Sequence, residues 1–64
     1  MTLTARQYEI AILVTRGCTN PEIASMLGIS VNAVKKHVSR VMVLVDASNR
    51  TELAAIAGRW PDHE

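Results

Sequence analysis

Residues Asn20–Arg40, NPEIASMLGISVNAVKKHVSR, decide the fold, because they have the pattern of two short helices joined by a tight turn. Asn20 is a good N-cap, since its side-chain oxygen can accept a hydrogen bond from an unpaired backbone amide, and Pro21 suits the first helical position. Gly28 can take the left-handed conformation that ends a helix after Leu27. The first helix of the pair is therefore predicted over 21–27.

The second helix of the pair is predicted to begin at Val31, with Ser30 as its N-cap and Ile29 pointing inward from the turn. Its apolar residues recur at steps of four, three and four positions, which places them on one face: Val34, Val38, Val41 and Val45. This face is expected to pack against the first helix and the core.

The other face of the second helix is polar and basic, with Asn32, Lys35, Lys36, Ser39 and Arg40. No Asp or Glu occurs between Ile23 and Val45, so this face is locally cationic in a chain whose net charge is only +1. An ordinary solvated helix also carries lysines. The short helix, the glycine turn and the basic second helix together favour a helix-turn-helix that lays its second helix in the major groove of DNA.

A helix over 5–16 is predicted before this stretch. Thr4 and Gln7 have the spacing of a capping box, and Gly17 ends the periodic run. Ile12 falls outside the expected buried face, which consists of Ile10, Leu13 and Val14.

A fourth helix is predicted over 50–60, after a second capping box formed by Asn49 and Glu52. Its inward face would hold Leu53, Ile56, Ala57 and Trp60. A neighbouring face of small side chains would either pair with a second copy in a homodimer or form an ordinary alanine-rich surface: Thr51, Ala54, Ala55 and Gly58. The whole chain, 1–64, is thus expected to be one all-α, four-helix domain.

Composition narrows the function further. One cysteine, Cys18, excludes an internal disulfide, and with only His37 and His63 it gives no zinc-ligand spacing. No carboxylate pair, nucleophile with a base or glycine-rich phosphate loop stands at a workable spacing, so no enzyme, catalytic residue, metal or cofactor is expected. No apolar run approaches the roughly 18 residues that span a bilayer, and no signal peptide is visible, so a cytoplasmic location is expected.

The apolar run Val41–Val45 cannot face one core throughout, so Val43 or Leu44 is expected to be at least partly exposed. Such a patch would either contact a partner or close a crowded helix end. The sequence leaves both open.

Many residues match one bacterial family in order and spacing over nearly the whole chain: Leu3, Thr4, Arg6, Glu9, Ile10, Leu13, Gly17, Asn20, Glu22, Ile23, Ala24, Leu27, Gly28, Ile29, Ser30, Val34, Lys35, His37, Val38, Asn49, Arg50, Thr51 and Glu52. On these residues the chain resembles the LuxR/FixJ-type, or GerE-like, helix-turn-helix domain of transcription regulators. The resemblance implies a four-helix domain whose third helix enters the major groove of double-stranded DNA and whose fourth commonly mediates dimerisation.

The resemblance also implies roles for single residues. Lys35 would contact a phosphate, while Lys36, Ser39 and Arg40 would approach base edges. His37 would either touch phosphate or pack partly buried, and packing is favoured. Four residues near helix N-termini would contact backbone phosphates: Thr19, Asn20, Ser30 and Asn32.

Several positions depart from the family pattern. Ala33 replaces a usual Thr and Asp46 a usual Gly, whereas Pro21, Val43 and Leu44 stand where basic residues are common. Fewer phosphate contacts imply weaker binding and a shallower salt dependence than in a typical member.

The sequence also allows two rival functions. One is the promoter-recognition domain of a sigma factor, which would make RNA polymerase a partner. The other is a protein-interaction module with weakened DNA binding that uses the surface of Val43 and Leu44.

Overall fold

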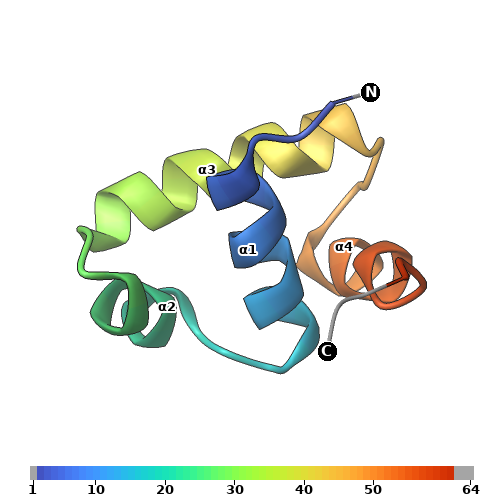
Figure 1. Ribbon diagram of the computed structural model, residues 1–64. Helices are drawn as coiled ribbons and strands as arrows, with labels where there is room; N and C mark the ends of the chain where they lie inside the picture. The colour runs from blue at the N-terminus through green and yellow to red at the C-terminus, as the bar shows by residue number, and fades with distance from the viewer. Residues whose placement is uncertain (1, 62–64) are drawn as a thin grey trace.

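Four helices follow one another in the computed structural model, which describes residues 2–61 (Figure 1): α1 (Ala5–Thr15), α2 (Asn20–Leu27), α3 (Val31–Leu44) and α4 (Arg50–Ala57). The described residues contain no strand, so the predicted all-α class is confirmed. The predicted start of the third helix at Val31 is also correct.

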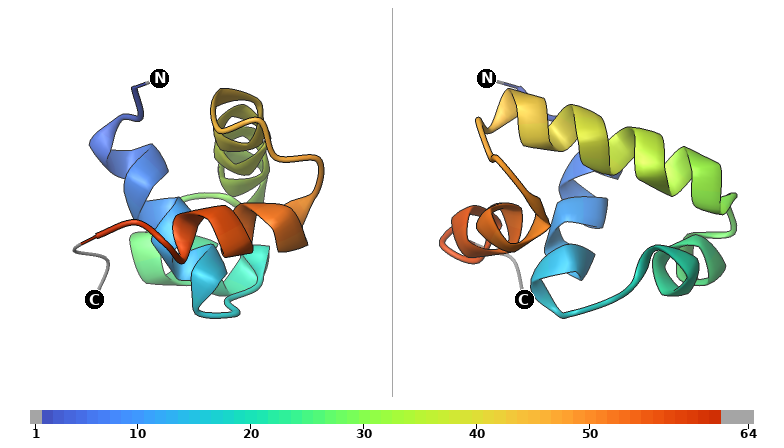
Figure 2. Two further views of the ribbon diagram at one scale, coloured as in Figure 1. Left: turned by 90° about the vertical axis from the view of Figure 1, so that its right-hand side faces the viewer. Right: turned by 180° about the vertical axis from the view of Figure 1, so that it is seen from behind.

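Helix α1 lies at the centre of the fold. Both α3 and α4 pack against it, and α2 packs against α3 (Figure 1; Figure 2). Because α1 is covered from more than one side, its buried surface is wider than a single stripe. Ile12, which was expected to lie outside the buried face, is therefore buried as well, and the prediction for it is wrong. The buried core consists of Ile10, Ala11, Leu13, Val14, Ile23, Ala24, Val34, Val38, Val41, Leu53 and Ala57.

The helix starts follow local capping rules. Thr4 and Gln7 form the predicted capping box, in which each side chain accepts from the other residue's backbone N–H. At α2, however, the N-cap is Thr19 and not Asn20, and Asn20 is already helical. The reason is that Thr19 and Glu22 form a capping box. Thr19 Oγ1 accepts a hydrogen bond from Glu22 N, and Glu22 Oε1 accepts one from Thr19 N.

Helix α4 is shorter than predicted, because it ends at Ala57 and not at Trp60. After Gly58 the chain continues in tighter turns, with Trp60 N donating to the Ala57 carbonyl. Trp60 then stacks on Tyr8 with ring centroids 5.4 Å apart. The predicted capping box is only half present, since Asn49 Oδ1 accepts from Glu52 N but Glu52 Oε1 accepts from Ser48 N.

Helices α1 and α3 end in the same way, with a left-handed residue just beyond the C-cap. After α1 that residue is Gly17 (φ 81°), and after α3 it is Asp46 (φ 60°). Beyond α3, Ala47 N donates to the Met42 carbonyl and Asp46 N to that of Val43, which is a Schellman motif. Asp46 thus occupies a position that favours glycine, and its carboxylate lies at the negative end of the helix dipole.

We expect Asp46→Gly to raise the free energy of unfolding by about 0.5–1 kcal/mol, because relief of backbone strain and of charge repulsion exceeds the added entropy of the unfolded chain. Urea denaturation followed by circular dichroism measures this change. Asp46→Asn removes the charge but keeps the side chain, so it should give a smaller increase. If Asp46→Gly lowers the free energy of unfolding, the result would contradict the claim that the left-handed backbone at Asp46 is strained.

Candidate nucleic-acid interface

Helices α2 and α3 form a helix-turn-helix whose turn is built from three successive residues. Gly28 takes the predicted left-handed conformation (φ 69°), and its N–H donates to the Ala24 carbonyl. Ile29 packs against the core, and Ser30 Oγ caps α3 by accepting from Ala33 N at 3.0 Å. The turn and its cap therefore fix the direction in which α3 leaves α2.

One face of α3 is buried and the other is open to solvent. Val34, Val38 and Val41 are buried as predicted, and Val45 packs half-buried beside them. The five residues predicted for the opposite face are all exposed, and they are called the α3 outer face below: Asn32, Lys35, Lys36, Ser39 and Arg40.

The cations of the α3 outer face are not neutralised by the protein. Among residues 2–61, Lys35, Lys36 and Arg40 form no ion pair, and α3 carries no Asp or Glu. Three positive charges thus lie within two turns of one helix, spaced to follow a polyanion.

Two predicted phosphate contacts also have a structural role. The hydroxyl oxygens of Thr19 and Ser30 accept the capping hydrogen bonds at the starts of α2 and α3. Both residues are exposed, and each hydroxyl keeps its hydrogen to donate elsewhere. Capping and phosphate binding are therefore compatible at these residues.

Asn20 has a partner that the sequence pattern did not indicate. Its side-chain Oδ1 accepts a hydrogen bond from Arg50 Nη1, and Arg50 Nη2 donates to the Cys18 carbonyl at 2.7 Å. Arg50 matched the family pattern without a role, and only the chain's tertiary path brings it to Asn20.

His37 lies half-buried on α3. It follows Lys36 and precedes the buried Val38, at the border between the outer and the inner face. Half-burial suits both of its predicted roles, the packing residue and the phosphate contact.

The small residues of α4 are only partly available for pairing. Thr51, Ala55 and Gly58 are exposed and recur at steps of four and three, so they share one stripe. Ala54 is half-buried and packs against the core. The predicted set of four therefore divides into three surface residues and one packing residue.

The apolar run at the end of α3 is exposed in part, as predicted. Val43 is 79% exposed and Leu44 39%. Val43 follows Lys36 and Arg40 at steps of four and three residues, so it continues the line of the α3 outer face.

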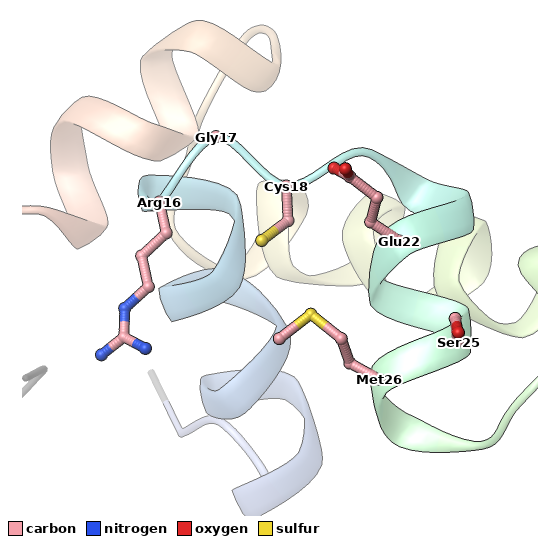
Figure 3. A pocket seen from close by; sticks show the side chains of 6 residues that line it. All are labelled: Arg16, Gly17, Cys18, Glu22, Ser25 and Met26. Carbon is pink, nitrogen blue, oxygen red and sulfur yellow. The ribbon is translucent and has the colours of Figure 1, made fainter.

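A hollow of about 500 Å³ lies between the end of α1 and the outer side of α2 (Figure 3). The side chains of Cys18 and Met26 point toward each other in it, with Arg16 and Glu22 at its borders. Within residues 2–61, no three His, Cys, Asp or Glu side chains gather to hold a metal ion. None of the helices described there is long and apolar enough to cross a membrane.

The family described as bacterial regulatory proteins, luxR family, matches residues 1–57. The two-component response regulator PprB of Pseudomonas aeruginosa is 50% identical over 52 residues, which are 81% of this chain and 19% of that protein. The transcriptional regulatory protein LiaR of Bacillus subtilis is 40% identical over 57 residues, 89% of this chain and 27% of LiaR.

A third relative is the response regulator protein VraR of Staphylococcus aureus, which is 38% identical over 55 residues, 86% of this chain and 26% of VraR. The chain therefore spans between about a fifth and about a quarter of the length of these relatives. The match covers all four helices of the fold.

Proposed function

Because the chain belongs to the LuxR family of bacterial regulatory proteins, and so is a helix-turn-helix DNA-binding domain of transcription regulation, we propose that it binds specific sequences of double-stranded DNA through the α3 outer face. The observation that carries the proposal is this exposed face, whose three cations have no acidic partner among the described residues. In the bound complex α3 lies in the major groove, with Lys35 on a phosphate and Lys36, Ser39 and Arg40 near base edges.

The N-termini of α2 and α3 supply further backbone contacts in this proposal. Thr19, Asn20, Ser30 and Asn32 lie at or beside these two helix ends, where the positive end of each helix dipole favours a phosphate. His37, at the border of the outer face, serves mainly as a packing residue.

We further propose that the domain binds as a homodimer. The exposed stripe of Thr51, Ala55 and Gly58 lets two copies of α4 approach closely, because none of its side chains is large. A symmetric dimer would recognise a palindromic site whose half-sites lie about one helical turn, or a multiple of it, apart.

Selection of bound duplexes from a random pool tests both statements. Enrichment of an inverted repeat supports sequence-specific binding by a dimer, and enrichment of a single half-site supports the monomer. If the bound duplexes share no sequence motif, the result would contradict sequence-specific binding. Comparison at two salt concentrations separates base contacts from the phosphate contribution.

A second candidate function is suggested by Val43 and Leu44, which are 79% and 39% exposed and form adjoining apolar surface at the end of α3. In this alternative the end of α3 contacts a protein partner. The candidate partner is RNA polymerase, because a transcription regulator meets it at a promoter. The family match is to LuxR-type regulators, which does not support the sigma-factor alternative.

Val43→Lys distinguishes the two functions. If the α3 outer face lies along DNA, the added cation should tighten duplex binding about fivefold at about 0.15 M salt and steepen the slope of log K against log salt by about 0.9. Val43→Gln is the matched uncharged control. Unchanged DNA affinity together with loss of binding to polymerase, measured by co-purification, would favour the protein interface.

A further inference from the structure

Arg50, the first residue of α4, reaches the junction between α1 and α2. Its guanidinium donates to Asn20 Oδ1 at 2.5 Å and to the Cys18 carbonyl oxygen at 2.7 Å, and both hydrogen bonds are partly buried. These acceptors lie 30 and 32 positions earlier in the chain. Since α4 packs on α1 and α2 packs on α3, this side chain links the start of α4 to the start of α2.

The hydrogen bond to Arg50 decides how the Asn20 amide is turned. A guanidinium has donors only, so Asn20 has to present its oxygen to Arg50. The NH₂ group of the same amide then points away from the guanidinium. Within residues 2–61 this NH₂ donates to no acceptor, and because no buried side-chain nitrogen or oxygen there lacks a partner, the NH₂ is accessible to solvent.

We infer that Arg50 is a positioning residue for DNA binding, which turns the Asn20 amide so that its NH₂ donates to a DNA phosphate. The inference rests on the proposed function, in which the N-terminus of α2 meets the DNA backbone. It adds a reason why an arginine begins α4: the two terminal nitrogens of its rigid, planar guanidinium donate to the loop carbonyl and to the amide oxygen in a fixed arrangement, which a single lysine nitrogen does not provide.

Asn20→Asp is the sharpest substitution for testing this orientation. The aspartate keeps an acceptor for Arg50 and adds an ion pair, so the fold and its melting temperature should be preserved or improved. It also replaces the outward donor by an anionic oxygen. Duplex affinity should therefore fall at least about tenfold, against about fivefold for Asn20→Ala, which removes the donor to DNA and the acceptor for Arg50 but adds no negative charge.

Arg50→Lys tests the coupling itself, because it keeps the positive charge but loses the fork. With Asn20 present it should weaken duplex binding about threefold to fivefold, and in the Asn20→Ala background it should cause little further loss. A general structural role for Arg50 would instead give the same loss in both backgrounds.

The experiment measures fluorescence anisotropy of a duplex selected from the random pool, with melting curves showing that each variant is folded at the assay temperature. The ¹⁵N side-chain resonance of Asn20, followed during DNA titration of the unsubstituted chain, provides an independent readout if Arg50→Lys does not fold. The inference predicts a large shift of this resonance on binding.

Three results would each overturn the inference. The Asn20→Asp variant could bind the duplex as tightly as the unsubstituted chain, or Arg50→Lys could weaken binding equally in both backgrounds. The third is an Asn20 side-chain resonance that does not shift when DNA is added. If the unsubstituted chain binds no duplex, the proposed function fails and the inference fails with it. If replacement of Lys35, Lys36 and Arg40 abolishes duplex binding but Asn20→Asp leaves the affinity unchanged, the proposed function stands and only the inference fails.

Discussion

Replacement of Lys35, Lys36 and Arg40 by alanine together should weaken duplex binding about 10²-fold at about 0.15 M salt, because each cation that neutralises a phosphate releases a condensed counterion. The slope of log K against log salt should become shallower by about 3. All three side chains are exposed, so the fold should be retained. Anisotropy titrations over a range of salt concentrations give both numbers.

A matched control removes the same charge elsewhere. Arg6 and Arg59 are also exposed, and they lie on α1 and after α4, outside the helix-turn-helix and the loop before it. Their replacement by alanine lowers the net charge by two but should change binding less than about threefold, since charges farther than a Debye length of about 8 Å from the phosphates are largely screened. The matched double variant of Lys36 and Arg40 loses the same charge and should weaken binding about 30-fold. Equal losses in these two double variants would mean that only overall charge attracts DNA, and not the α3 outer face.

Leu53→Ala should lower the free energy of unfolding by about 3 kcal/mol, within the usual range of 2–5 kcal/mol for such truncations. Leu53 is fully buried, and it is the largest α4 side chain in the core. A domain of this length is stabilised by only about 3–10 kcal/mol, so the variant should be largely unfolded near its former melting temperature. Urea denaturation measures the loss.

Leu44→Ala is the matched comparison, because it removes the same atoms from a side chain that is 39% exposed at the end of α3. Its cost should stay below about 1 kcal/mol, since less apolar surface is lost from the interior. Similar losses for the two leucines would contradict the packing of α4 on α1.

The sequence was most informative where the cause of the structure is local. The box of Thr4 and Gln7, the cap at Ser30 and the turn at Gly28 each depend on residues within one helical turn, and all three are confirmed. The valine stripe of α3 follows from helical periodicity alone. The valine stripe alone therefore separates the buried face of α3 from its outer face.

The predictions that proved wrong concern positions where two neighbouring residues satisfy the same capping rule, or where contacts between residues far apart in the chain determine the structure. Thr19 and Asn20 are both good N-caps, and the reciprocal hydrogen bonds with Glu22 select Thr19. Ile12 is buried because α1 is central, which the periodicity of one helix cannot reveal. Trp60, which was expected inside α4, lies beyond its end and stacks on Tyr8, a residue far away in the chain.

In the candidate interface, too, the features with local causes could be predicted and those that depend on distant residues could not. Exposure of the α3 outer face could be predicted from its pattern, and the structure confirms that exposure. The contact from Arg50 to Asn20 could not, because it spans 30 residues and depends on how α4 is placed beside α1. The DNA contacts themselves stay predictions.

The most direct test of the central claim, that the α3 outer face lies against DNA, is a ¹H–¹⁵N correlation spectrum recorded while a selected duplex is added. We predict that the largest shifts fall on the α3 outer face and on the first turns of α2 and α3, while the amides of α1 between Ile10 and Thr15 change little. Shifts confined to α4 or to the hollow beside Cys18, with α3 unmoved, would contradict the claim.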